Sequence, residues 1–341
     1  MRVPYLLRCL SSHTQHRCCV FVLVVIIFFS PVLAAQARPG TIRVDTSHPI
    51  NSFDPAFYNA GFRSNITAFL PIGNSSYNGL ATQLTKRFSH GLQFVGSYTF
   101  SHNIDDNTVS HFSTYLTPRR PQDFADMRNE RANSALDRRH RFTLSWVYQM
   151  PLLSKSNMWL AKNIIGNWQF TGTYTRETGE FVTAQSGQDS NLNGDSAGDR
   201  TVLNPAGNPN LGSGVTALKN SAGQTVGYLA QNPNARYIQA GLGVFPTAGR
   251  NTVEVPGINN FDVSLSKRFN VTEHKQIEFR GDATNVFNHP QYTPGLINSV
   301  KLTSYNTTRT FLTPQNASFQ MWNQVFASNA RQMQLVFRFT F

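Results

Sequence analysis

The chain has 341 residues, of which 14% are charged, 40% are hydrophobic and 12% are aromatic. Soluble domains usually contain about a quarter charged residues, so this composition disfavours an ordinary soluble protein. The formal net charge of +12 is spread along the chain, without a basic run or a nucleic-acid-binding motif, which argues against nucleic acid as a partner.

Residues 1–37 have the layout of a secretory signal peptide. Basic residues come first, an apolar stretch follows from Cys18 to Phe29, and small residues at Ala35 and Ala37 form a cleavage site. A transmembrane helix is the alternative, but Pro31 interrupts the apolar segment, which is shorter than the roughly 20 residues that a span prefers. All three cysteines lie in this leader, so the mature chain has no cysteine chemistry.

Residues 38–73 match no assigned pattern, although Phe62 to Leu70 is a weak candidate for an extra strand. From residue 74 to 341, seven segments alternate apolar and polar residues, as strands do when one face meets lipid and the other a polar lumen. Each has about the ten residues that a tilted membrane-spanning strand needs. The segments are 77–88, 91–101, 141–150, 164–176, 258–269, 275–287 and 333–341.

Short and long connections alternate between these segments. The long ones, 102–138, 177–257 and 288–330, are rich in Asn, Ser, Gly, Pro and Thr, and we expect them to be unstructured loops outside the cell. The sequence therefore predicts an all-β fold, an antiparallel transmembrane β-barrel of about seven to eight strands with long extracellular loops, in an outer membrane. Aromatic residues near strand ends suit the lipid–water boundary: Trp146, Tyr148, Trp159, Trp168 and Tyr174.

The last segment, Met333–Phe341, alternates and closes on a C-terminal Phe. It resembles the final strand by which the barrel assembly machinery recognises outer-membrane proteins, with Phe337, Phe339 and Phe341 as the assembly signal. Further matching segments are Ser76–Leu80, Lys86–Leu92, Ser97–Ser101, Asp137–Phe142 and Asn285–His289. As an ordered set, these segments look like the C-terminal barrel third of Oar-like TonB-dependent receptors.

The resemblance implies an outer-membrane transport component, whose outer loops meet an unknown ligand and whose energy comes from TonB through a plug. The plug, the TonB box and the family's N-terminal domain are not visible in this sequence, and seven strands cannot enclose the lumen of a barrel of about twenty-two. The favoured interpretation is a receptor fragment spanning 74–341. Its rival is a small, closed, eight-stranded barrel with a structural or adhesive role.

One outer loop contains a candidate calcium site. Asp189, Asn191, Asn193 and Asp195 alternate as oxygen ligands do, Gly194 permits a sharp turn, and Asp199 follows. An EF-hand is excluded, because Arg200 stands where its final Glu belongs. A solvated turn explains the same residues.

A second candidate site is basic, and its arginines suit anionic substrates or lipopolysaccharide phosphates, unless they form a salt-bridged loop base. Its members are Arg128, Glu130, Arg131, Asp137, Arg138, Arg139, His140 and Arg141. A barrel hydrolase would draw on His102, Asp105, Asp106 and His111, whose spacing fits no triad or metal signature. No phosphate loop, nucleophile elbow or zinc-helix motif is present, so the sequence predicts neither an enzyme nor a cofactor besides calcium.

Overall fold

The protein is described by a computed structural model. It covers residues 21–29, 38–43, 65–70, 73–107, 121–123, 126–151, 158, 166, 168–192, 199–270, 272, 275–292, 311–325 and 328–341. The fold is all-β, and the helices in these ranges, η1 (Met127–Glu130) and α3 (Trp322–Val325), have four residues each. None of the described helices has the length and apolar character needed to cross a bilayer.

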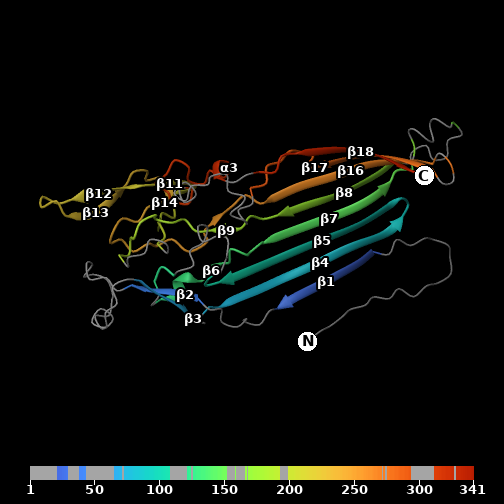
Figure 1. Ribbon diagram of the computed structural model, residues 1–341. Helices are drawn as coiled ribbons and strands as arrows, with labels where there is room; N and C mark the ends of the chain where they lie inside the picture. The colour runs from blue at the N-terminus through green and yellow to red at the C-terminus, as the bar shows by residue number, and fades with distance from the viewer. Residues whose placement is uncertain are drawn as a thin grey trace.

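The largest unit is an antiparallel sheet in the strand order β1-β4-β5-β7-β8-β16-β17-β18, with β6 attached to β5 (Figure 1). Seven of these strands confirm the seven predicted segments, with ends shifted by a few residues. They are β4 (Ser75–Ser89), β5 (Leu92–Asp105), β7 (His140–Gln149), β8 (Trp168–Glu177), β16 (Ile258–Asn270), β17 (Gln276–Thr284) and β18 (Gln332–Thr340). We call these seven strands the wall. Within the described residues it is open, because β18 pairs only with β17.

The strand register places the predicted apolar positions on one common face. Phe94 lies opposite Trp146, which lies opposite Gly172, and Gly172 lies opposite Val263. The next strands continue the row through Ala283 and Met333. Apolar residues predominate on this face of every wall strand except β4, where Leu80 and Leu84 share it with Thr82 and Lys86. The other face is rich in Ser, Thr, Gln and charged residues, so the first is the lipid-facing side.

The β4–β5 hairpin has a tight turn at its inner end. His90 and Gly91 have φ values of +53° and +77°, as type I′ turns require, and that turn suits the twist of paired strands. A Cβ on Gly91 would lie 2.4 Å from the carbonyl oxygen of Gln149 on β7. Glycine is therefore needed at this turn for both its backbone angle and its lack of a side chain.

The 177–257 connection corrects the expectation of unstructured loops, because it contains seven strands in small sheets. These are β9 (Phe181–Val182), β10 (Val202–Leu203), β11 (Asn208–Ser213), β12 (Val215–Lys219), β13 (Thr225–Ala230), β14 (Ala235–Ile238) and β15 (Val253–Glu254). They pair as β10-β14-β11, β12-β13 and β15-β9. β6 (Ala132–Asn133), from an earlier loop, pairs with the outer end of β5.

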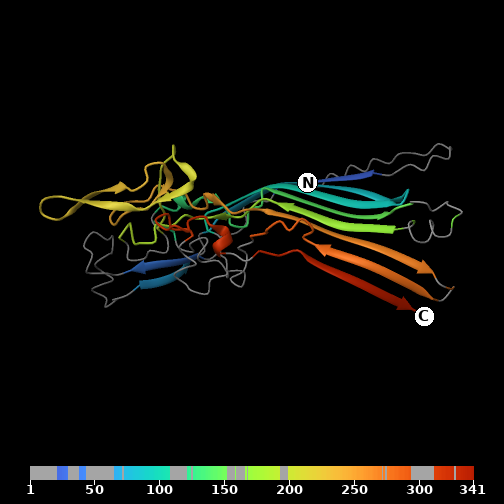
Figure 2. The same ribbon diagram turned by 90° about the horizontal axis from the view of Figure 1, so that it is seen from above.

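Both views place these small sheets together at one end of the wall, opposite the C-terminus (Figures 1 and 2). The long connections leave the wall at this end, so it is the extracellular one, and Phe341 is at the periplasmic end. Short and long connections alternate along the whole wall, as the sequence predicted.

The N-terminal strands do not follow the wall's pattern. β1 (Phe21–Phe29), which covers most of the predicted leader's apolar core, pairs antiparallel with β4 but has no polar residue at any position. The weak candidate at Phe62 to Leu70 does contain a strand, β3 (Asn65–Leu70), which pairs with β2 (Arg38–Arg43) and not with the wall. The signal peptide itself stays a prediction.

Candidate functional site in the outer loops

The outer loops enclose a hydrophobic core of their own. Phe311 and Leu312 pack with side chains from 177–257, although about sixty residues separate the segments, and Phe319 meets Tyr237 edge-on at 5.8 Å. The buried members are Val182, Ala184, Tyr237, Val253, Val255, Phe311, Leu312 and Phe319. We call this core and the segments around it the loop assembly; it is packed like the interior of a soluble domain.

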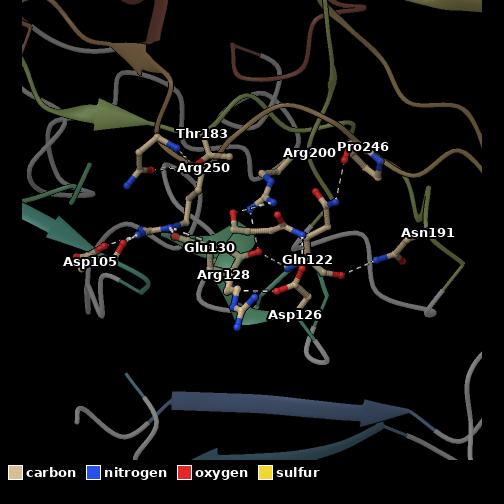
Figure 3. A network of polar contacts seen from close by, with 12 residues as sticks. Asp105, Gln122, Asp126, Arg128, Glu130, Thr183, Asn191, Arg200, Pro246 and Arg250 are labelled. Atoms are coloured by element: carbon tan, nitrogen blue, oxygen red, sulfur yellow. Dashed lines mark hydrogen bonds and ion pairs between the residues drawn. The ribbon is translucent and has the colours of Figure 1, made fainter. Parts of the chain in front are cut away.

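A buried chain of ion pairs joins the wall to the loop assembly (Figure 3). Arg250 donates from Nη2 to Oδ1 of Asp105, at the outer end of β5, and from Nε to the carbonyl oxygen of Glu130 at 3.0 Å. Oε1 of Glu130 accepts from Arg200 Nη1 at 2.8 Å and from the Gln122 backbone N–H at 2.9 Å. We call Asp105, Glu130, Arg200 and Arg250 the ion-pair network.

The network has no net charge and is buried. Two carboxylates face two guanidinium groups, and none of the four residues is more than 5% exposed. Burial lowers the pKa of Arg200, while the nearby Glu130 carboxylate acts in the opposite direction. Since an unpaired charge here would be costly, each member requires the others.

Neutral hydrogen bonds continue the network into other loops. Gln122 donates from Nε2 to the Pro246 carbonyl at 3.1 Å, and Asn191 donates to the Gln122 carbonyl at 2.7 Å. Thr183, which follows β9, donates to Asn251 Oδ1, and Asn251 in turn donates to the Asn133 carbonyl in β6. Segments from two connections, 102–138 and 177–257, are thereby held in one arrangement.

The predicted basic cluster is mostly turned inward. Arg138 holds Glu177 at 2.9 Å and Glu180 at 2.7 Å, and Arg139 holds the fully buried Asp137 at 3.2 Å. Burial raises the pKa of Glu180, with Arg138 opposing it. The structure thus supports the salt-bridged loop base for this part of the cluster; Arg128 and Arg131 are exposed, and Glu130 belongs to the ion-pair network.

The residues considered for a hydrolase do not converge. His102 Nε2 lies 2.9 Å from Asn133 Oδ1, Asp105 pairs with Arg250, and Asp106 Oδ1 accepts from the Asn74 backbone N–H. His111 lies outside the described residues. The described residues of this group therefore do not face a common centre.

Of the calcium candidates, Asp189 and Asn191 are described, while Asn193 and Asp195 lie outside the described residues. Asp199 is fully buried, and its Oδ2 accepts the backbone N–H groups of Ser190 and Asn191. Burial raises the Asp199 pKa to about 7 despite these hydrogen bonds. No group of three His, Cys, Asp or Glu in the described ranges is placed to hold a metal ion, and calcium binding stays a prediction.

The lipid-facing side has the aromatic residues expected of it. Trp146 contacts Phe170 and Phe261, with ring centroids 5.7 and 5.4 Å apart, and Tyr174 contacts Phe261 at 5.3 Å. Trp168 opens β8 and Tyr148 nearly ends β7, whereas Trp159 lies outside the described residues. A groove of about 470 Å³ lies between Trp168, Leu265, Phe279, Leu335 and Phe337.

The C-terminal residues occupy the same face. Phe337 packs 5.0 Å from Phe279 and Phe339 stacks 5.9 Å from Phe341, and the rings of Phe337, Phe339 and Phe341 are 48–89% exposed. Their alternation places all three rings on one side of the final strand. Recognition by the assembly machinery stays a prediction.

The hairpin of β12 and β13 extends furthest from the wall (Figure 1). Tyr228 anchors its base, donating a hydrogen bond to the Leu242 carbonyl at 3.0 Å with its ring over Gly241. Leu218 and Leu229, which the register places on the opposite face of the hairpin from Tyr228, are 47% and 61% exposed.

A family model described as an outer membrane beta barrel domain matches residues 30–334. The chain belongs to this family. The match agrees with the antiparallel wall, and it places the chain in the outer membrane. No curated protein and no solved structure matches the chain.

Sequence reasoning missed the ion-pair network as a unit. It considered Asp105 for catalysis and Glu130 for a basic cluster, and it did not single out Arg250. Asp105 and Arg250 are 145 residues apart, and Glu130 and Arg200 are 70 apart. The one available signal was Arg200, a basic residue at the end of an acidic turn that contains Asp189, Asp195 and Asp199.

Proposed function

We propose that this outer membrane beta barrel domain forms part of the wall of a transporter of the TonB-dependent receptor type. The observation that carries the proposal is the combination of a polar face continuing across seven strands with a folded loop assembly at their outer end. A polar face of this width suits a wet lumen. Loops fixed by buried ion pairs present a preformed surface to a ligand, which lowers the ordering cost of binding.

In this proposal the projecting β12–β13 hairpin and its neighbours meet the ligand, the polar face lines the lumen, and a plug that contacts TonB lies within that lumen. The predicted non-enzymatic role is consistent with the family. The ion-pair network then maintains the loop geometry, since it links β5 to two separate connections, 102–138 and 177–257.

The test is made in outer membranes of the source cells. A photoreactive label on Thr171→Cys, which faces the lumen, should crosslink to a plug segment, whereas the same label on neighbouring Phe170→Cys should reach only lipid. The polypeptide ending in Phe341 should also have an intact mass well above 38.2 kDa. A species slightly below that mass, without crosslinks at Thr171, would contradict the proposal.

A second candidate is the small closed barrel with a structural or adhesive role, and β1 favours it. β1 pairs antiparallel with β4, so it runs in the direction needed to meet β18 as an eighth strand. N-terminal sequencing of the mature chain decides whether this strand is retained. Cleavage before Arg38 removes it and leaves the transporter proposal.

A further inference from the structure

The lipid-facing side of the wall has cations but no carboxylates. In the seven wall strands the register places every Asp and Glu on the polar face; these are Asp105, Glu177, Asp262, Glu278 and Asp282. Lys86, Arg176 and Lys267 lie on the lipid-facing side. An anion approaching this side therefore meets only positive charge.

The three cations differ in depth and in partners. Lys86 and Lys267 lie near the periplasmic ends of their strands, and Lys267 is buried, bonds to the Gly166 carbonyl and lies 5.3 Å from the Phe269 ring centroid. Arg176 is next to the last residue of β8, at the outer end. It is exposed, and its side chain has no hydrogen bond or ion pair with any described residue.

The neighbours of Arg176 are hydrogen-bonding groups. Asn259 lies opposite it on β16 and Phe142 on β7, which places His140 on the diagonal, about 7–8 Å away between Cα atoms. Nδ1 of His140 is 2.8 Å from the Tyr98 hydroxyl, so Nε2 is the nitrogen left for another partner. His140 and Asn259 are both exposed.

We propose that Arg176, with His140 and Asn259 beside it, binds a phosphate group of lipopolysaccharide in the outer leaflet. A guanidinium group at the edge of the hydrocarbon is poorly hydrated and gains most from a bidentate contact with phosphate oxygens. Depth supports the assignment, because this end of β8 is the extracellular one. The basic cluster at 128–141 is a poorer site, since Arg138, Arg139 and Arg141 already hold carboxylates.

The test uses the full chain extracted from outer membranes in mild detergent, with the lipopolysaccharide retained per chain as the readout. Arg176→Gln should reduce retention roughly tenfold, as expected for the loss of one charge-assisted contact. Arg176→Lys should keep part of the lipopolysaccharide retention, because lysine keeps the positive charge but cannot make a bidentate contact with phosphate. The matched control is Arg141→Gln on the adjacent strand, 63% exposed but on the polar face, which should retain the wild-type amount.

Unchanged retention in Arg176→Gln, or an equal loss in Arg141→Gln, overturns the proposal. So does a retained lipid that proves to be phospholipid. Heat-dependent gel mobility checks that each variant is folded. A measurement without any variant uses the wild-type chain in phospholipid vesicles containing intact or dephosphorylated lipid A, and equal enrichment of both around the chain contradicts phosphate recognition.

Discussion

In the wall, Leu335 and Phe337 are 89% and 63% exposed, whereas in the loop assembly Phe311 and Leu312 are 0% and 1% exposed. The charged groups show the same pattern: Arg268 of the wall is 59% exposed, and Arg250 of the loops is 3% exposed. The wall is built for lipid outside and water within, so it needs no buried core. The loop assembly stands in water and folds as soluble domains do.

The largest expected effect separates the two regions through charge. Glu130→Ala leaves Arg200 buried without its carboxylate, which should destabilise the loop assembly by about 3–5 kcal/mol. Hydrogen exchange should rise in 177–257 and remain unchanged in β7 and β8. The control Glu278→Ala breaks the pair with Arg268, whose side chain is 59% exposed, and should cost at most about 1 kcal/mol.

A charge placed in the wall should act in the opposite way. Leu144→Arg, in the middle of β7 on the lipid-facing side, should destabilise the barrel by about 2–4 kcal/mol, because the guanidinium enters hydrocarbon. Thr143→Arg, one residue away on the polar face, should cost little. Denaturant midpoints in lipid vesicles measure both, and equal effects would contradict the assignment of the faces.

Packing within the wall should be sensitive at one glycine. A Cβ on Gly172 would lie 2.3 Å from the Trp146 ring and 2.7 Å from the Asp262 carbonyl oxygen, so Gly172→Ala should cost about 1–3 kcal/mol. At Gly281 the nearest atom, on Leu335, is at 3.5 Å, and alanine should be tolerated. The same denaturant midpoints distinguish them; a neutral Gly172→Ala would mean that the ring moves freely.

The last expected effect is a pH dependence confined to the loops. Because the pKa of Asp199 is about 7 in the folded chain and lower when unfolded, the folded state binds the extra proton. The stabilisation that this proton provides is complete below the pKa that Asp199 has in the unfolded chain, and it is lost as the pH rises through about 7. Exchange rates around 186–201 should increase over this range in wild type but not in Asp199→Asn.

The two regions also differ in how far sequence predicts them. The faces of the wall follow from a period of two, a local pattern that residues such as Phe142 and Leu144 display without reference to distant parts of the chain. The loop assembly has no such period. Its contacts, such as Asp105 with Arg250, depend on how several connections meet in space, so Asn- and Gly-rich composition alone suggested unstructured loops.

The same limit explains the outcome for the candidate sites. Arginine spacing identified 138–141 as basic but not that Glu177 and Glu180, from the next strand and loop, neutralise Arg138. Arg176 was seen only as part of a strand, because its lack of a partner is a property of its neighbours in the sheet.

With β1, the main path of the sheet, which leaves out β6, has eight strands, and its end strands, β1 and β18, run in opposite directions. Without β1 the count is seven, and β4 and β18 run in the same direction. Two seven-stranded copies placed edge to edge would have to join β18 to β4 in parallel, so they could not complete one antiparallel cylinder. Removal of the leader would therefore change how the barrel can close. The eight-stranded sheet can close on itself, whereas the seven-stranded sheet needs an odd number of strands from another polypeptide segment to complete an antiparallel barrel.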